Sequence, residues 1–204
     1  MADNFGDVLG RHLHAEYRVV LAARTLKHAD ATVTEVHSDH ATHDRSDPLP
    51  PADAFGVALQ LRDFPVHEWW EDGRAAPVSA LRAGQTTVYD LKRDPRFRMN
   101  NPFHSIHVAL PRAFMDTVAD EFGNGQIVDL EYSPGKGVDD PVVEPLLLAL
   151  RPALMRPEEA SRLFVDHVTR AVAAHVAVTY GHLGEGDGTR TVVSRRGSSG
   201  GPLT

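Results

Sequence analysis

The chain has 204 residues, of which 42% are hydrophobic and 24% charged, a balance that is ordinary for a globular protein in water. Its formal net charge of -7 excludes an overall basic field for holding nucleic acid, and the absence of cysteine excludes disulfides, a thiolate nucleophile and Cys-ligated zinc. No apolar run reaches the roughly 20 residues of a membrane span, and "MADNFGDVLG" lacks a signal-peptide pattern, so we expect a cytoplasmic protein without a membrane partner.

The first half of the chain is typical of a series of short strands. Apolar or β-branched runs separated by polar breaks lie at 16–26, 31–39, 54–64, 84–91 and 103–111. Between the third and fourth runs, Asp72-Gly73 separates two extended arms, and this pair favours the positive φ angles of a tight hairpin. Short strands joined by turns rather than long helices predict a β-barrel or a sandwich.

The run 54–64 shows the alternation of a strand most clearly. Val57 and Leu59 fall on one face of it, and Ala58 and Gln60 fall on the other. In "FHSIHVALP", His104 and His107 are three apart, so they should point to opposite faces of their strand, which argues against joint metal ligation.

The pattern becomes helical after Pro111. The segment 111–122 opens with a proline and is followed by Gly123, which are a start and a stop signal. Two more helices are predicted at about 141–155 and 157–181. Pro145 and Pro152 predict that the first of these is short or kinked.

The last predicted helix carries an apolar stripe at helical spacing, opposite a polar face. The stripe consists of Ala160, Leu163, Phe164, Val168, Ala171, Ala174 and Val178. Arg162, Asp166, Thr169 and Arg170 form the opposite face. Such a helix packs either on the preceding strands or on a second copy of itself.

Histidine is frequent, with 12 residues in the chain. His37, His40 and His43 are spaced like ligands of zinc or iron, but their polar neighbours favour a solvated loop. His12 and His14 would share a face in a strand, as a cupin metal site needs, yet this segment is equally typical of a helix. We therefore assign no metal ligand and no cofactor.

No set of catalytic residues emerges from spacing, so we expect a protein that is not an enzyme. "HEWW" places Trp69 on the same strand face as His67. Aromatic rings with a few polar groups line small-molecule pockets, although ordinary packing of a small barrel gives the same composition.

Three long segments carry a resemblance to a known family. They are "PLPPADAFGVALQLRDFPVHEWWEDGR", "AGQTTVYDLKRDPRFRMNNPFHSIHVALPRAFMDTVADE" and "RPALMRPEEASRLFVDHVTRAVAAHVAVTYG". In this order they resemble the N-terminal portion of AraC-type transcriptional regulators, in the branch with an AraC-binding-like cupin domain. The resemblance covers about residues 30–182 and concerns fold and role rather than a catalytic motif.

The resemblance implies an α+β fold, a cupin-like β-barrel followed by a helical dimerisation segment. Residues 1–14 would be an N-terminal arm, 15–138 an effector-sensing barrel that includes the helix 111–122, and 139–182 the dimerisation segment. Residues 183–204, which end in "RRGSSGGPLT", would be a linker toward a C-terminal helix-turn-helix domain that reads operator DNA. The implied function is to sense a small effector, form a homodimer and control DNA binding through that domain.

Two sets of residues follow from this resemblance. His67, Trp69, Tyr89 and His104 are the candidate ligand-binding residues, because they are polar or aromatic and lie in predicted barrel strands. Leu163, Phe164, Val168 and Ala171 are the candidate dimer contact, with packing of the same stripe on the barrel as the alternative.

Two other functions stay open at this point. One is a metal-dependent cupin enzyme, which would need two His on one strand, an acid, and a further His from a later strand. The other is a stand-alone dimerisation module that modulates a full-length regulator. The coding DNA beyond Thr204 distinguishes a sensor domain from a stand-alone module.

Overall fold

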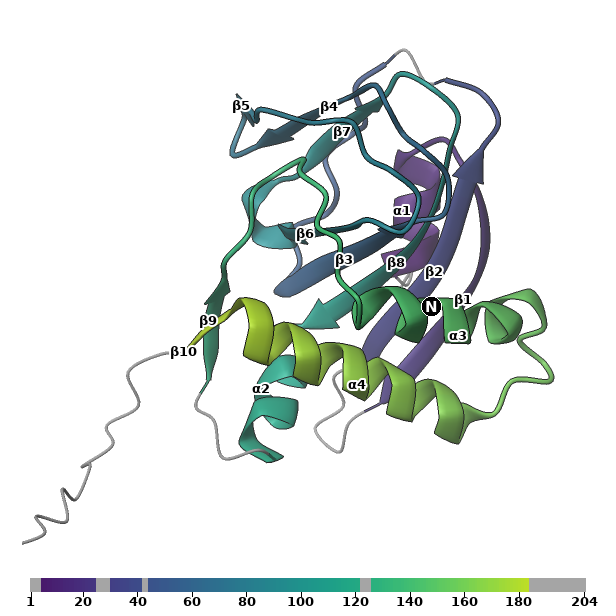
Figure 1. Ribbon diagram of the computed structural model, residues 1–204, viewed down its shortest axis with the longest axis vertical. Coiled ribbons are helices and arrows are strands. Elements are labelled where there is room, and N and C mark those ends of the chain that lie inside the picture. The colour runs from purple at the N-terminus through teal and green to yellow at the C-terminus, as the bar shows by residue number, and fades with distance from the viewer. Residues whose placement is uncertain (1–4, 25–29, 42–43, 122–125, 184–204) are drawn as a thin grey trace, which may run out of the picture.

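The computed structural model describes residues 5–24, 30–41, 44–121 and 126–183, with the backbone alone for 16–24 and for Leu183. It confirms the predicted mixture of helix and sheet (Figure 1). Of the predicted linker 183–204, all but Leu183 lies outside the described residues, as does His43 of the histidine cluster.

Two antiparallel sheets lie face to face (Figure 1). The larger sheet has the strand order β1 (Glu16–Arg24), β2 (Asp30–Ser38), β8 (Phe103–Pro111), β3 (Ala54–Gln60) and β6 (Thr86–Asp90). The smaller has the order β5 (Arg74–Ala75), β4 (His67–Glu71) and β7 (Arg96–Met99). No hydrogen-bonded ladder joins them within the described ranges, so the predicted cupin-like barrel consists of two facing sheets that are not closed.

Helices cover the other face of the larger sheet (Figure 1). They are α2 (Arg112–Glu121), α3 (Val143–Met155) and α4 (Arg162–Tyr180). Strand β9 (Ile127–Leu130) follows α2 and pairs with β10 (Gly181–Leu183), which follows α4. The short helix η1 (Leu91–Arg93) follows β6. The first helix, α1 (Phe5–His12), packs against β1 and β2, and its Leu9 is buried in the core between the sheets.

The larger sheet is buried on both faces, so the molecule has two apolar cores. Val57 and Leu59 of β3 join the core beneath α2, α3 and α4, while Ala58 joins the core between the sheets. The predicted alternation is therefore confirmed, but no face of β3 meets solvent, since all seven of its residues are buried. Strand β7 was not predicted, because charged and apolar residues alternate over only four positions.

The predicted turns and helix ends agree with the structure in part. Asp72 and Gly73 have φ values of 50° and 73° between β4 and β5, which confirms the hairpin. Pro111 is the last residue of β8 rather than the first of a helix. Helix α4 begins at Arg162, five residues later than predicted, because the Ser161 hydroxyl accepts a hydrogen bond from the Phe164 amide, a side-chain N-cap.

The prolines of α3 do not shorten it. The helix spans 13 residues and includes both Pro145 and Pro152. Pro145 lies in the first turn, where an amide has no partner within the helix, so its missing N–H costs nothing there. None of the described helices is both long and apolar enough to cross a bilayer.

The apolar stripe of α4 does not form its buried face. That face consists of Val165, Thr169, Val172, Ala173, Val176 and Ala177, so Thr169, which the sequence places opposite the stripe, is buried. Of the stripe itself, Leu163 is 68% exposed and Phe164 44%, Ala171 is exposed, and Val168 is half-buried against the core. The buried face thus consists of valines, alanines and one threonine, whereas Leu163 and Phe164 are left outside.

One glycine makes room for an aromatic ring that lies on the larger sheet. Gly56 of β3 pairs with Tyr89 of β6, and the phenol ring lies directly over its Cα, where a Cβ would overlap the ring. Because overpacking in a core costs about 1–3 kcal/mol, we expect Gly56→Ala to lower the free energy of unfolding by at least about 2 kcal/mol in urea denaturation. Combining it with Tyr89→Ala should make the two effects clearly less than additive. Additive effects would show that the ring does not limit this position.

Candidate functional site

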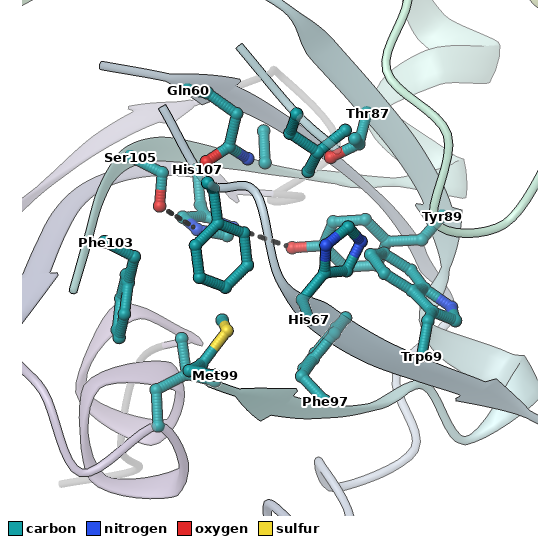
Figure 2. A pocket seen from close by; sticks show the side chains of 14 residues that line it. Gln60, His67, Trp69, Thr87, Tyr89, Phe97, Met99, Phe103, Ser105 and His107 are labelled. Carbon is teal, nitrogen blue, oxygen red and sulfur yellow. Dashed lines mark hydrogen bonds between the residues drawn. The ribbon is translucent and has the colours of Figure 1, made fainter. Parts of the chain in front are cut away.

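The core between the two sheets contains a small cavity (Figure 2). Its free volume is about 30 Å³, the room of one or two water molecules. Residues from β3, β4, β6, β7 and β8 line it, together with one residue of the turn after α1. The lining is Leu13, Ala58, Gln60, Phe64, His67, Trp69, Leu81, Thr87, Tyr89, Phe97, Met99, Phe103, Ser105 and His107.

Three of the polar side chains are joined in a series by hydrogen bonds (Figure 2). Ser105 Oγ lies 2.8 Å from His107 Nε2, and Tyr89 Oη lies 3.0 Å from His107 Nδ1. Complete burial lowers the pKa of His107 to about 4, so the imidazole is neutral at neutral pH. In either neutral tautomer both ring nitrogens have a partner, since the two hydroxyl groups can each donate or accept.

His67 is the opposite case, because at least one of its ring nitrogens is buried without a hydrogen-bond partner. Neither nitrogen makes a hydrogen bond of standard geometry, and the residue is only 6% exposed. Burial lowers the pKa of His67, and a weak hydrogen bond with the backbone of Gly135, which can engage one ring nitrogen, offsets this in part. Its ring stacks on Phe64 at 5.1 Å between centroids, so apolar contacts rather than hydrogen bonds hold it at the cavity wall.

The remaining wall is aromatic and rigid. Trp69 packs edge to face on Phe97 at 4.5 Å and on Tyr89 at 5.6 Å. Edge-to-face pairs add about 0.5–1.5 kcal/mol each beyond the burial of area. Phe64 and Phe103 pack in the same way at 6.1 Å.

Behind this wall, Trp69 is hydrogen-bonded to a buried carboxyl group. The indole Nε1 donates to Glu71 Oε1 at 3.3 Å, and Tyr132 Oη donates to Glu71 at 3.1 Å. Burial raises the pKa of Glu71 to about 7, and the hydrogen bonds from Tyr132 and Trp69 offset this only in part. Tyr132 Oη also accepts from the amide of Asp90, so it links β4, β6 and the segment after β9.

The structure brings together three of the four candidate ligand-binding residues, His67, Trp69 and Tyr89. His104 lies on the opposite face of β8, as its spacing from His107 predicts, and it lines a separate cavity of about 110 Å³. There its Nε2 lies 2.6 Å from Glu35 Oε1, which Arg151 of α3 also contacts at 3.4 Å. His107, which shares a face of β8 with Phe103 and Ser105, lines the cavity between the sheets and was not among the candidates.

The histidine patterns do not converge as a metal site. His12 ends α1 and His14 lies in the turn after it, with φ 49°, so they are not in the strand that a shared face requires. Among the residues that the structure describes, no group of three His, Asp or Glu side chains is placed to hold a metal ion. His37 lies beside His104, at 5.5 Å between ring centroids.

In comparisons with known proteins, no family model and no curated protein matches the chain. Among solved structures it is similar to the AraC-like transcriptional activator CuxR, at 13% identity and a TM-score of 0.46, over 88% of this chain and 68% of CuxR. A Cupin 2 conserved barrel domain protein from Salinispora arenicola is 13% identical, with a TM-score of 0.35, over 52% of this chain and 84% of that one. The Cupin_2 domain of an XRE family transcriptional regulator from Enterobacter cloacae is 15% identical, with a TM-score of 0.27, over 40% and 79%. These likenesses concern the arrangement of strands and carry no functional argument.

Replacing the imidazole ring by a phenyl ring should change the free energy of unfolding in opposite directions at the two buried histidines. We expect His67→Phe to raise the free energy of unfolding by about 1–2 kcal/mol, because it removes a buried nitrogen that lacks a hydrogen bond and keeps a ring on Phe64. His107→Phe should lower it by about 2–4 kcal/mol, because the hydroxyls of Ser105 and Tyr89 lose their partner. Chemical denaturation of both variants measures this. Destabilisation of equal size in both would mean that His67 is bonded like His107.

The carboxyl group of Glu71 should make stability depend on pH. Its pKa is raised in the folded chain, so the folded state binds more protons than the unfolded state between about pH 4.5 and 7, and the free energy of unfolding falls as pH rises through this window. Allowing for partial solvent screening, we expect Glu71→Gln to abolish about 1–2 kcal/mol of this fall. Urea denaturation from pH 4.5 to 8 measures it. Glu68→Gln, on the other face of β4, is the control and should keep the fall.

Proposed function

We propose that this chain is the effector-sensing and dimerisation domain of an AraC-type transcription regulator, and that it is not an enzyme. The observation that carries the proposal is His67, which lines a cavity between two sheets with at least one ring nitrogen that lacks a hydrogen bond. An unmet hydrogen bond of a buried group costs about 1–3 kcal/mol. A ligand that supplies the missing partner recovers this free energy, so the site favours a bound state.

Side-chain contacts lead from the cavity to Tyr132, and the backbone continues from there to α3. Trp69 contacts Glu71, and Glu71 contacts Tyr132, which precedes the segment that leads into α3. In that segment Asp140 accepts from the first amides of α3, from His175 Nε2 at 2.9 Å and from Tyr180 Oη at 2.6 Å. A ligand that favours one position of Trp69 would thereby bias the packing of α3 on α4, which is how a sensor domain transmits binding.

An exposed apolar surface on α3 and α4 supports the dimerisation role. Phe164 of α4 is 44% exposed and lines a groove whose α3 wall includes Ala149, Pro152 and Met155, with Arg156 and Glu159 as polar members. Met155 is 57% exposed, and Leu163, next to Phe164 in the chain, is 68% exposed. Exposed apolar side chains are typical of a protein interface, and in the proposed homodimer they lie against the same surface of a second copy.

Operator DNA would be bound by a helix-turn-helix domain joined to the C-terminal end, since the charge of -7 gives this chain no basic field. The coding DNA tests this part of the proposal. We expect about a hundred further codons with two helix-turn-helix patterns and a basic balance. A stop codon directly after Thr204 would instead favour a stand-alone dimerisation module.

The dimer surface can be tested in solution. We expect Leu163→Arg to convert a dimer into a folded monomer, because it places a charge at the centre of an apolar contact while its own side chain makes few contacts within the chain. Sedimentation equilibrium measures the mass, and circular dichroism checks the fold. Val66→Arg is the matched control, since Val66 is 55% exposed on the far side of the molecule. A dimer that survives Leu163→Arg places the contact elsewhere.

A further inference from the structure

The chemistry of the cavity wall restricts which ligand it can take, and this inference rests on the proposed sensing function. None of the residues that line the cavity is Asp, Glu, Lys or Arg. The nearest carboxyl group described behind the wall, Glu71, is turned to Tyr132 and the indole nitrogen of Trp69. A charged ligand would therefore lose its hydration without meeting an opposite charge, which is strongly unfavourable in an apolar site.

The ring nitrogens of the wall differ in whether they have a hydrogen-bond partner. Ser105, His107 and Tyr89 satisfy one another, so a ligand gains little by competing for them. Among the ring nitrogens of the wall, those of His67 keep free capacity, since the Gly135 backbone can engage at most one of the two. With its N–H directed at that backbone, the neutral imidazole still offers one acceptor, which matches a hydroxyl or a ring N–H group.

The size of the cavity favours a compact molecule, and its aromatic wall favours a ring. The rings of the wall contact one another edge to face, at 4.5 to 6.1 Å between centroids, and form a largely apolar lining. The present volume of about 30 Å³ is too small for a ring, since a cavity of about 150 Å³ holds benzene. Met99 is the wall residue that can yield, because it is half-buried and its unbranched side chain adapts to irregular space.

We propose that the effector is a compact, uncharged ring compound with one hydroxyl or N–H group, that this group hydrogen-bonds His67, and that Met99 moves aside to admit the ring. In this mode of recognition, neither the ligand nor the side chains that contact it carry a charge. Aromatic contacts supply most of the affinity, and His67 supplies the selection against plain hydrocarbons.

Phenol, benzoate and benzylammonium test this proposal as a matched set, since they have similar rings and differ in charge. We would titrate each into the full chain at pH 7.5 and follow the imidazole signals of His67 and the indole signal of Trp69 by NMR. Phenol should bind at least about tenfold more tightly than either ion, because only the ions lose hydration without compensation. His67→Phe should weaken phenol binding about 3- to 10-fold, the range of one neutral hydrogen bond.

Two further variants complete the test. Met99→Ala should strengthen phenol binding several-fold by enlarging the cavity, whereas His40→Phe, an exposed control outside the cavity, should leave it unchanged. Tighter binding of benzoate or benzylammonium would overturn the proposed ligand class and leave the sensing function standing. If none of the three probes shifts the His67 and Trp69 signals, even in Met99→Ala, the cavity takes no such ligand and the sensing function proposed for it fails as well.

Discussion

The larger sheet is covered on both sides, by helices on one face and by a second sheet on the other, and this double burial governs the chemistry of the molecule. In such a sheet every side chain of a central strand enters a core, so a polar residue must find a partner there or remain unsatisfied. Strand β8 shows the consequence within four residues. Ile106 packs beneath the helices, while Ser105 and His107 enter the core between the sheets and bond each other.

Some of the polar groups inside the molecule are matched, although the hydroxyls of Thr32, Thr34 and Thr86 on the larger sheet are not. His107 has a hydroxyl on each side, and Asp140 has four donors, from the Val142 and Val143 amides, His175 and Tyr180. Burial alone would raise the pKa of Asp140, but these hydrogen bonds outweigh it and lower the pKa to about 2. His67 differs from both, since it lies at the wall of the cavity with at least one ring nitrogen unbonded. In the proposed function, this nitrogen is where the ligand binds.

The sequence predicts those features that depend on local pattern. Val57 and Leu59 reveal one face of β3 because strand periodicity is two, and Asp72-Gly73 reveals a hairpin because its backbone geometry is restricted to few residue types. His67 and Trp69 were found as cavity residues by the same alternation. Tyr89 was found because it is the aromatic residue of its short strand.

The features that the sequence does not predict depend on which helix or sheet covers each face of a strand or helix. His104 and His107 are equivalent in pattern, and only the placement of α3 over one face of β8 sends His104 to Glu35 and Arg151 rather than into the cavity. The stripe of α4 fails for a related reason. Hydrophobicity favours Leu163 and Phe164 as the buried face, yet α4 buries a neighbouring stripe of valines and alanines together with Thr169.

The face that β8 turns to the cavity and the face that α4 leaves exposed both bear on how the proposed ligand cavity is coupled to the surface. Glu71 has a pKa of about 7 and connects Trp69 to Tyr132, and Tyr132 packs against both cores. A ligand can shift the chain between two states only by as much as its affinity differs between them, which is typically about 1–3 kcal/mol. A hydrogen bond to the unbonded nitrogen of His67 represents a free energy of this size. Under the proposed sensing function, forming this bond in one arrangement of the aromatic wall would bias how α3 and α4 present Leu163 and Phe164 to a partner.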